Sequence, residues 1–361
     1  MEEIQPVIQN FLEELVLQNK ERGIQFVAYH QGKVLVDAYA GICNPQTGKK
    51  VESSTLFPVF STTKGMAATL IHLLVERGQL NYQTRIADLW SEFGAHGKTE
   101  ITVAHALNHS AGLPYMPLGL RHRDLSDWTK MCELIADLTP ASAPGALMCY
   151  HAITYGWILG EVARRVDGRF FTQMLADEIS RPLGVTTMYV GLPDSFVGEV
   201  ALLESGFEEK TEKIILTESK PQAIPDLVCP LHEWMNRDDA QRACLPASNG
   251  VMNAHSIARH YAALLPGGVG GVELLPPSRV RLALELQHPT QSQDPEYEYR
   301  QRLGYQMISF ASPSGFGHHG YGGSSGFADP ELGLAVGFTR NRFSKENPLS
   351  EIMGLLLKSL K

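Results

Sequence analysis

The chain has 361 residues, of which 43% are hydrophobic and 19% are charged, and its formal net charge is −8. This globular composition excludes wholesale disorder, and the length suits one large domain or two intimate ones that fold without disulfides or a structural metal. The negative charge argues against a protein whose main partner is nucleic acid or an anionic membrane surface.

The cysteines and the N-terminal residues indicate the cellular compartment in which the protein is expected. The five cysteines are widely spaced, odd in number and without a CxxC pair, which predicts reduced buried thiols. The acidic, periodic start lacks the basic residues and continuous apolar run of a signal peptide. No uncharged apolar stretch approaches the ~20 residues of a membrane span. We therefore expect a cytoplasmic protein without a membrane span.

The first part of the chain alternates between helix and strand patterns. Apolar residues spaced three or four apart predict an amphipathic helix over residues 3–18. Two β-prone runs, 24–30 and 33–41, are joined by a short Gln-Gly connection that predicts a hairpin. A buried helix over 61–78 is expected to begin near a Ser/Thr cap and to end at a glycine.

The middle of the chain is predicted to be mainly helical. Residues 102–150 mix short helices with Pro and Gly, and further helices are expected over 156–168 and 255–265. Residues 197–245 are polar, irregular and interrupted by prolines. Because long loops in compact domains often form lids or pocket walls, we expect a lid-like region there.

The C-terminal part returns to strand patterns before a final helix over 347–360. The expected strands lie within four short runs separated by Gly and Pro: 303–310, 314–320, 324–330 and 332–341. Strands at both ends with helices between them predict an α+β fold. We expect a discontinuous sheet domain from residues 1–60 and 250–361, and a mainly helical domain from residues 61–249.

The segment Ser61-Thr62-Thr63-Lys64 carries the first candidate for chemistry. A serine hydroxyl needs a neighbouring base, and residues three apart share a helix face, so Lys64 can reach Ser61. A helix N-terminus favours a developing alkoxide, and a buried lysine with a lowered pKa can take the proton. Ser-x-x-Lys also arises by chance about once in a chain of this length, so coincidence stays open at this point.

Two further segments carry candidates with competing interpretations. Tyr150, before the predicted helix over 156–168, is either a base beside Ser61 or an aromatic residue that packs at a rim. The segment 315–326 is rich in glycine and contains two histidines. Its backbone N–H groups either help to form an oxyanion hole or belong to a glycine-rich hairpin with a surface histidine.

Other kinds of catalysis have weaker support. His105 and His109 have a helical ligand spacing, but the glutamate of a zincin HExxH motif is missing. The adjacent His318 and His319 point to opposite faces of a strand. The chain contains neither a Walker-type phosphate loop nor a Gly-x-Ser-x-Gly elbow. We expect no metal and no other cofactor.

Taken together and in order, these segments resemble the serine β-lactamase and penicillin-binding-protein superfamily, which uses Ser-x-x-Lys and Lys-Thr-Gly elements. The resemblance is closest to class C-like members, including family VIII carboxylesterases and β-lactamase-related serine hydrolases. It implies a β-lactamase/transpeptidase-like fold, with an antiparallel sheet flanked by helices, a mainly helical domain, and the active site between them. The matching segments are 57–80, 101–114, 150–169, 179–185, 246–264 and 316–342.

The resemblance also implies roles for individual residues. Ser61 matches the acyl-enzyme nucleophile, Lys64 its companion base, and Tyr150 the tyrosine of the second motif. His318-His319-Gly320 takes the place of Lys-Thr-Gly, so that His318 and Gly320 would lie at the substrate. The oxyanion hole of the family would be formed by the backbone N–H groups of Ser61 and Tyr321.

Two departures from the class C pattern favour the esterase branch over antibiotic degradation. Ala152 stands where class C enzymes have an asparagine that contacts the side-chain amide of β-lactams. His318 stands where a lysine supplies a fixed charge for the β-lactam carboxylate. His318 would make activity sensitive to pH near neutrality, or it would only brace Tyr150.

We therefore expect a serine hydrolase that cleaves small-molecule carboxylic esters through an acyl-enzyme on Ser61. The alternative is an acyltransferase or thioesterase that passes the acyl group to an acceptor other than water. A β-lactamase or DD-peptidase, or a catalytically silent binding relative, is less favoured. Tyr115, Trp128 and Trp234 are candidates for the pocket wall, with ordinary packing as the alternative. The pattern predicts no particular oligomeric state.

Overall fold

The centre of the molecule is a seven-stranded antiparallel sheet. The computed structural model describes residues 3–206, 220–285, 291–292, 301–310, 312–344 and 346–360. The strands lie side by side in the order β10 (Gln306–Met307), β11 (Phe316–His319), β12 (Ser325–Asp329), β13 (Leu334–Arg340), β1 (Gly23–His30), β2 (Lys33–Asn44) and β3 (Lys49–Lys50). The two ends of the chain therefore meet in one sheet where β13 pairs with β1.

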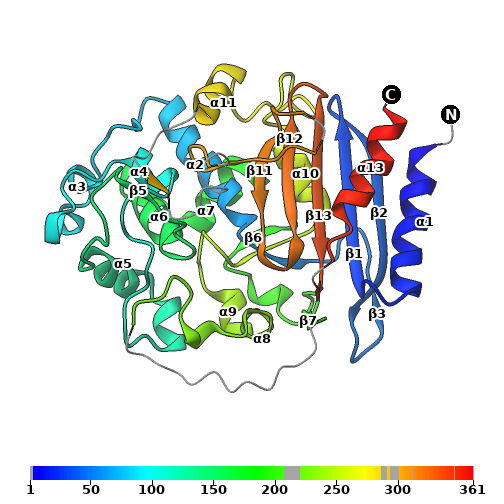
Figure 1. Cartoon of the computed structure of the whole chain (residues 1–361), viewed down its shortest axis with the longest axis horizontal. Coiled ribbons are helices and arrows are strands. Elements are labelled where there is room, and N and C mark those ends of the chain that lie inside the picture. The colour runs from blue at the N-terminus through cyan, green and yellow to red at the C-terminus, as the bar shows by residue number, and fades with distance from the viewer. Residues whose placement is uncertain are drawn as a thin grey trace.

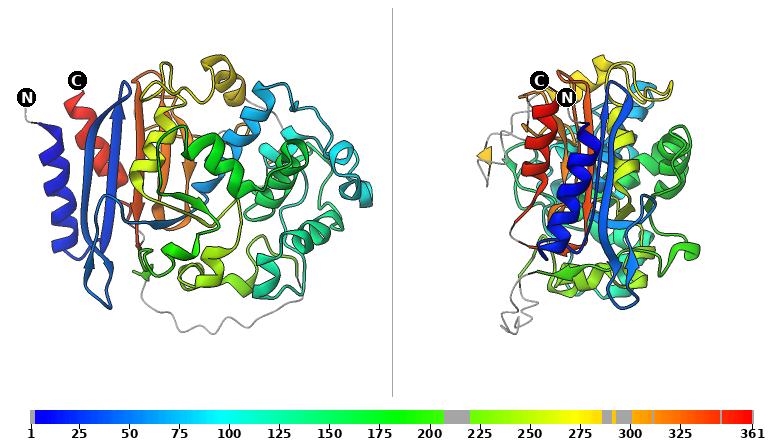
Figure 2. Two further views of the ribbon diagram at one scale, coloured as in Figure 1. Left: turned by 180° about the vertical axis from the view of Figure 1, so that it is seen from behind. Right: turned by 90° about the vertical axis from the view of Figure 1, so that its right-hand side faces the viewer.

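Helices cover both faces of this sheet, as Figures 1 and 2 show. Helices α1 (Ile4–Leu17) and α13 (Leu349–Ser359) pack on one face, and α10 (Ala254–Ala262) packs on the other. All seven residues of β13 are buried because helices cover both faces of the sheet there, and the first five of them, residues 334–338, are apolar or glycine. Gly337 in β13 permits this close packing, since a Cβ there would lie 2.0 Å from the Ala254 carbonyl oxygen.

The helical part lies at the end of the molecule opposite α1 (Figure 1). Its central element is α2 (Thr63–Glu76), in which every residue from Thr63 to Val75 is buried. A helix that is apolar nearly all round must be enclosed by other elements. The helices that pack on α2 are α6 (Thr154–Asp167), α7 (Phe171–Leu175) and α11 (Pro277–Leu284). Around α6 in turn lie α3 (Ile86–Leu89), α4 (Val103–Leu107) and α5 (Trp128–Ala136).

Smaller strand pairings connect the two parts. A second sheet has the order β4 (Phe57–Phe60), β8 (Gly250–Met252) and β6 (Met188–Val190). Strand β14 (Arg342–Phe343) pairs in parallel with β7 (Glu204–Ser205), and β5 (Leu147–Met148) pairs with β9 (Gln291–Ser292). Because β4 leads directly into α2, the second sheet positions the residues between them.

Most expected elements are present, with one clear correction. The helix predicted over 3–18 and the hairpin of 24–30 and 33–41 are confirmed by α1, β1 and β2. The region 197–245 is less irregular than expected, since its described part includes β7 and the short helices α8 (Leu231–Met235) and α9 (Asp238–Arg242). Helices of five residues are too short to show a periodic pattern, and burial of Trp234 and Met235 stabilises α8 instead. Residues 207–219 of the expected lid lie outside the described residues.

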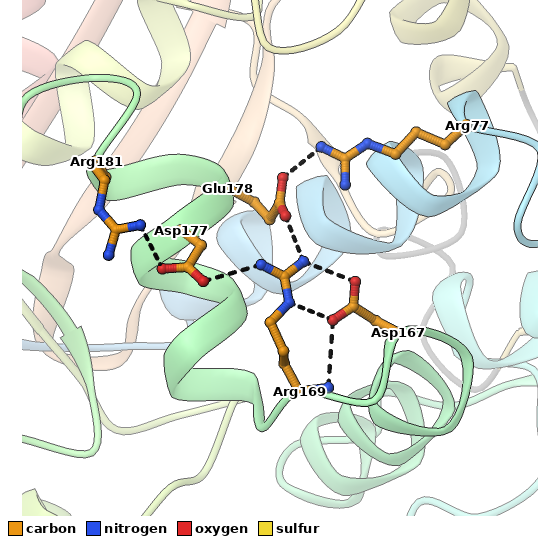
Figure 3. A network of polar contacts seen from close by, with 6 residues as sticks. All are labelled: Arg77, Asp167, Arg169, Asp177, Glu178 and Arg181. Carbon is orange, nitrogen blue, oxygen red and sulfur yellow. Dashed lines mark hydrogen bonds and ion pairs between the residues drawn. The ribbon is translucent and has the colours of Figure 1, made fainter.

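An ion-pair network ties three helices together at the surface (Figure 3). The Arg169 guanidinium contacts the carboxylates of Asp167, at the end of α6, and of Asp177 and Glu178, just after α7. Arg77, which follows α2, pairs with Glu178, and Arg181 pairs with Asp177. The network therefore fixes the far end of α2 against the two helices beside it.

A second ion pair is fully buried. Arg340 Nη2 lies 2.6 Å from Glu21 Oε1 and Arg340 Nε lies 3.1 Å from Glu21 Oε2, with the two side chains 1% and 2% exposed. Glu21 follows α1, and Arg340 ends β13 and also donates to the Glu346 carbonyl. The pair therefore anchors the chain where it leaves the sheet toward β14.

We predict that Glu21→Ala lowers the free energy of unfolding by about 3–5 kcal/mol, because it leaves a guanidinium buried without its partner. Urea denaturation measures the change. Asp88→Ala is the control, since its ion pair with Arg85 is about half exposed and should contribute less than about 1 kcal/mol. Equal losses in the two variants would contradict the prediction.

Candidate active site

Ser61 lies in a tight turn between β4 and α2. Phe60, the residue before it, has a φ of 46°, which is uncommon for a bulky side chain. The Thr63 hydroxyl holds this turn, because it donates to the Phe60 carbonyl at 2.5 Å and accepts from the Gly250 N–H at 2.9 Å. The turn presents Ser61 to a cavity of about 360 Å³.

Lys64 lies one helical turn further on and is completely buried. Its Nζ is 3.3 Å from Ser61 Oγ, 2.8 Å from the Ala152 carbonyl oxygen and 2.9 Å from the Ala247 carbonyl oxygen. Burial lowers the pKa of this amine well below its ordinary range. The structure thus brings together the two residues that the Ser-x-x-Lys spacing predicts to be neighbours.

Tyr150 also lies at this amine, just before α6. The Lys64 Nζ is 4.7 Å from the centre of the Tyr150 ring and 5.5 Å from that of Tyr155. Tyr150 and Ser61 line the same cavity. Ser61 and Lys64 from one segment and Tyr150 from another therefore lie within one site.

Histidines surround the lysine without adding charge. His109, His151 and His318 are all buried, and burial lowers the pKa of each, that of His151 to about 4. His151 donates from Nδ1 to the Cys149 carbonyl and accepts at Nε2 from the Leu113 N–H, so it has no place for a second proton. These rings are polar but uncharged near neutral pH.

The resemblance implied that His318 lies at the substrate, but His318 is not among the described lining residues of the cavity, whereas its neighbour His319 is. The His318 ring centre is 6.2 Å from that of Tyr150, and its Nδ1 donates to the His319 carbonyl at 2.7 Å. Burial and the nearby Lys64 lower its pKa well below the ordinary range. The lowered pKa of this buried ring contradicts the expectation that titration of His318 makes activity pH-sensitive near neutrality, and the alternative that His318 braces Tyr150 stays a prediction.

The residue that follows β11 approaches the turn between β4 and α2, which carries Ser61, very closely. A Cβ on Gly320 would lie 2.2 Å from the Val59 carbonyl oxygen and 2.2 Å from Ser324 Oγ, so only glycine fits at this contact. The next residue, Tyr321, lines the cavity together with Ser61. The backbone of residues 320 and 321 thus lies beside the turn that carries Ser61 and at the same cavity.

The cavity wall is mainly apolar and aromatic. Its larger apolar and aromatic side chains are Phe60, Ile153, Ile224, Leu231, Trp234 and Tyr321. Tyr150, Gln306 and His319 are its larger polar side chains, and none of the described lining residues is Lys or Arg. Of the three wall candidates from the sequence, Trp234 lines this cavity, whereas Trp128 lines a different one. Tyr115 is not among the described lining residues of either cavity.

Several contributors to the site were missed by sequence reasoning. The carbonyls of Ala152 and Ala247 hold the lysine, but any residue type supplies a carbonyl, so residue identity carries no signal. His109 was considered as a metal ligand, and its Nδ1 instead accepts from the His151 N–H. Its ring centre lies 4.6 Å from that of Tyr150.

Metal-ligand groups, thiols and membrane spans were checked over the described ranges. Within them, no group of three or more His, Cys, Asp or Glu side chains could hold a metal ion. All five cysteines are free, and Cys43 and Cys132 are buried as expected, whereas Cys149 and Cys244 are only partly buried and Cys229 is exposed. No helix in the described part of the chain is both long and apolar enough to cross a membrane.

The fold agrees with comparisons to known proteins. The profile of the beta-lactamase family matches residues 7–355, and the chain belongs to this family. Esterase/beta-lactamase LipL of Mycobacterium tuberculosis is 30% identical over 342 residues, which cover 89% of this chain and 77% of that protein.

Solved structures show the same fold. A family VIII carboxylesterase superposes with a TM-score of 0.84 at 28% identity, covering 98% of this chain and 97% of its own. A penicillin-binding-protein homolog from Caulobacter crescentus superposes with a TM-score of 0.82 at 29% identity, covering 99% of this chain and 98% of its own. The expected β-lactamase/transpeptidase-like α+β fold is therefore confirmed.

The buried amine leads to a prediction about stability and pH. Because the pKa of Lys64 is lowered in the folded state, the unfolded chain binds one more proton at pH values between that pKa and about 10.4. Stability should therefore rise with pH through this window, by at most about 1.4 kcal/mol per pH unit. Lys64→Met should flatten this slope in urea denaturation series, whereas Met at the exposed Lys33 should leave it unchanged. An unchanged slope in Lys64→Met would contradict the prediction.

Proposed function

We propose that the protein hydrolyses carboxylic esters through an acyl-enzyme on Ser61, with Lys64 as the general base. The supporting observation is the set of three polar neighbours around Lys64 Nζ. Two of them are carbonyl oxygens, which only accept hydrogen bonds. The third is the Ser61 hydroxyl, which can donate.

This arrangement suits a neutral amine. Uncharged Lys64 has two N–H groups for the two carbonyls and one lone pair, which is left for the Ser61 hydroxyl proton. Burial favours this uncharged form, and a lysine near neutrality can accept a proton as serine attacks. The protonated amine that results keeps all three contacts, since it then donates to the Ser61 oxygen as well.

The attack forms a C–O bond from Ser61 Oγ to the ester carbonyl carbon and leaves a negative oxygen. Backbone N–H groups of Ser61 and Tyr321 would bind that oxygen, and removal of one such donor costs about 3 kcal/mol in known enzymes. Tyr150, beside Lys64, would give its hydroxyl proton to the departing alcohol as the C–O bond breaks and take up in its place the proton that Lys64 holds. Water then attacks the acyl-enzyme and releases the acid.

The apolar cavity supports an uncharged ester over a β-lactam as substrate. None of its described lining residues offers a cation to a β-lactam carboxylate, and the buried His318 stays neutral. Ala152 contributes its carbonyl to Lys64 but has no side-chain amide for substrate. The names of the esterase relatives also support an ester as substrate.

A cytoplasmic location and the division into a sheet domain and a helical domain stay predictions.

We predict that the wild-type protein hydrolyses p-nitrophenyl butyrate and that Ser61→Ala reduces kcat at least about a thousandfold, because no other group replaces the nucleophile. The release of p-nitrophenol measures this, and circular dichroism checks that the variant is folded. Ser126→Ala, at an exposed serine, is the matched control and should keep full activity. A folded Ser61→Ala protein with wild-type activity would overturn the proposal.

Acyl transfer to an alcohol or amine is the second candidate, and the cavity wall favours it. The side chains of Ile224, Leu231 and Trp234 come from the segment before β8 and make the site apolar, which would shield an acyl-enzyme from water.

Because hydrolysis is the proposed main reaction, we predict that free butyrate remains the main product when ethanol is added to the p-nitrophenyl butyrate reaction. Chromatography of the products decides, because ethyl butyrate as the main product would make transfer the principal activity.

A further inference from the structure

Phe343 contacts both sides of the proposed oxyanion hole. It lies in β14, is 3% exposed, and does not itself line the cavity. Its ring centre is 5.5 Å from that of Phe60 and 5.2 Å from that of Tyr321, in edge-to-face arrangements with interplanar angles of 60° and 81°. The rings of Phe60 and Tyr321 are themselves 5.8 Å apart. The three rings therefore form a closed triangle.

The two other members of this triangle adjoin the groups that would bind the oxyanion. Phe60 directly precedes Ser61, and Tyr321 carries the second N–H in its own backbone. The backbone after Tyr321 is shaped to the Phe343 ring as well. Gly322 has a φ of 81°, and a Cβ there would lie 2.0 Å from Phe343 Cε1. The ring thus occupies space that any other residue at 322 would need.

We propose that Phe343 is a positioning residue for the oxyanion hole. Its ring would hold the backbone N–H groups of Ser61 and Tyr321 at the separation that allows both to bind one oxygen atom. This inference rests on the proposed ester hydrolysis and adds a residue outside the cavity. The two donors come from elements far apart in sequence, β4 and the end of β11. The Ser324 hydroxyl joins the two segments directly by donating to the Val59 carbonyl at 2.7 Å, and the Phe343 ring is a further contact that touches both sides.

Phe343 is itself firmly anchored. Strand β14 pairs with β7, and the Gly206 N–H donates to the Phe343 carbonyl at 2.5 Å. Three residues earlier, Arg340 is held by the buried ion pair with Glu21. On a further side, the His232 ring of α8 lies 5.9 Å from the Phe343 ring. A ring that is fixed in this way can keep the backbone N–H groups of Ser61 and Tyr321 in a constant position relative to the main sheet.

The experiment compares Phe343→Leu with the wild type in hydrolysis of p-nitrophenyl butyrate. Leucine fills much of the space but lacks the ring edges that meet Phe60 and Tyr321. We expect kcat to fall about 10–100-fold with KM little changed, because small displacements of catalytic groups carry penalties of this size. Binding of butylboronic acid, whose Ser61 adduct places an oxygen in the hole, should weaken in proportion to kcat/KM.

A matched control separates positioning from packing. Phe26→Leu removes a buried phenylalanine from β1, on the face covered by α1, and should lower thermal stability without lowering kcat. Phe343→Met, with a flexible side chain of similar volume, is the second variant should Phe343→Leu not fold, and it should show the same loss in kcat. An unchanged kcat and boronate affinity in a folded Phe343 variant would overturn the proposal.

The two proposals fail in different ways. A wild-type protein without Ser61-dependent ester hydrolysis overturns the proposed function and, with it, the role of Phe343. A hydrolytic wild type with a fully active Phe343→Leu variant overturns only the positioning role. Equal losses of kcat in Phe343→Leu and Phe26→Leu would reduce Phe343 to a core residue.

Discussion

The burial of the Lys64 amine between two backbone carbonyls is the interaction on which the rest of the site depends. No carboxylate lies among its described polar contacts, so water exclusion alone lowers its pKa. A buried amine in its charged form lowers the stability of the folded state, and burial of the large apolar core must offset this loss. The enclosed helix α2 supplies this dry environment, because it is surrounded by the sheet on one side and by helices on the other. The fold and the chemistry therefore share one requirement, which is exclusion of water from the start of α2.

Backbone groups make many of the polar contacts in this site. The carbonyls that hold Lys64 come from residues 152 and 247, and the proposed oxyanion donors come from residues 61 and 321. These four positions are brought together by α6, β8, the β4–α2 turn and β11. Close approach of main chains explains why glycine is needed at residue 320, where a side chain would collide with Val59 and Ser324. The geometry of such a site depends on how strands and helices pack more than on which side chains line it.

This dependence on backbone explains what could be predicted from the sequence. The long amphipathic helix α1 and the β1–β2 hairpin have strong periodic or turn signals, and both were predicted. The neighbourhood of Ser61 and Lys64 followed from a spacing of three. Helix α8, with Trp234, was not predicted, because five residues carry no periodicity and its stability comes from tertiary burial. The neutrality of His318 was missed for a related reason, since residue type gives an ordinary pKa and only the packed structure shows that water is excluded.

The uncharged histidines complete an electrostatic argument about substrate. Because the Lys64 base is kept neutral by burial, its pKa is sensitive to any charge that enters the cavity. A substrate with a carboxylate near Ser61 would favour protonated Lys64 and so remove the base that activates the serine. A fixed cation at position 318 would oppose that effect, but this chain has a neutral imidazole there. With no described Lys or Arg on the cavity wall either, an uncharged substrate is the kind that leaves the base free to act. Burial without a counter-charge thus lowers the pKa of the Lys64 amine, and in the proposed function the same burial supports an uncharged substrate over an anionic one.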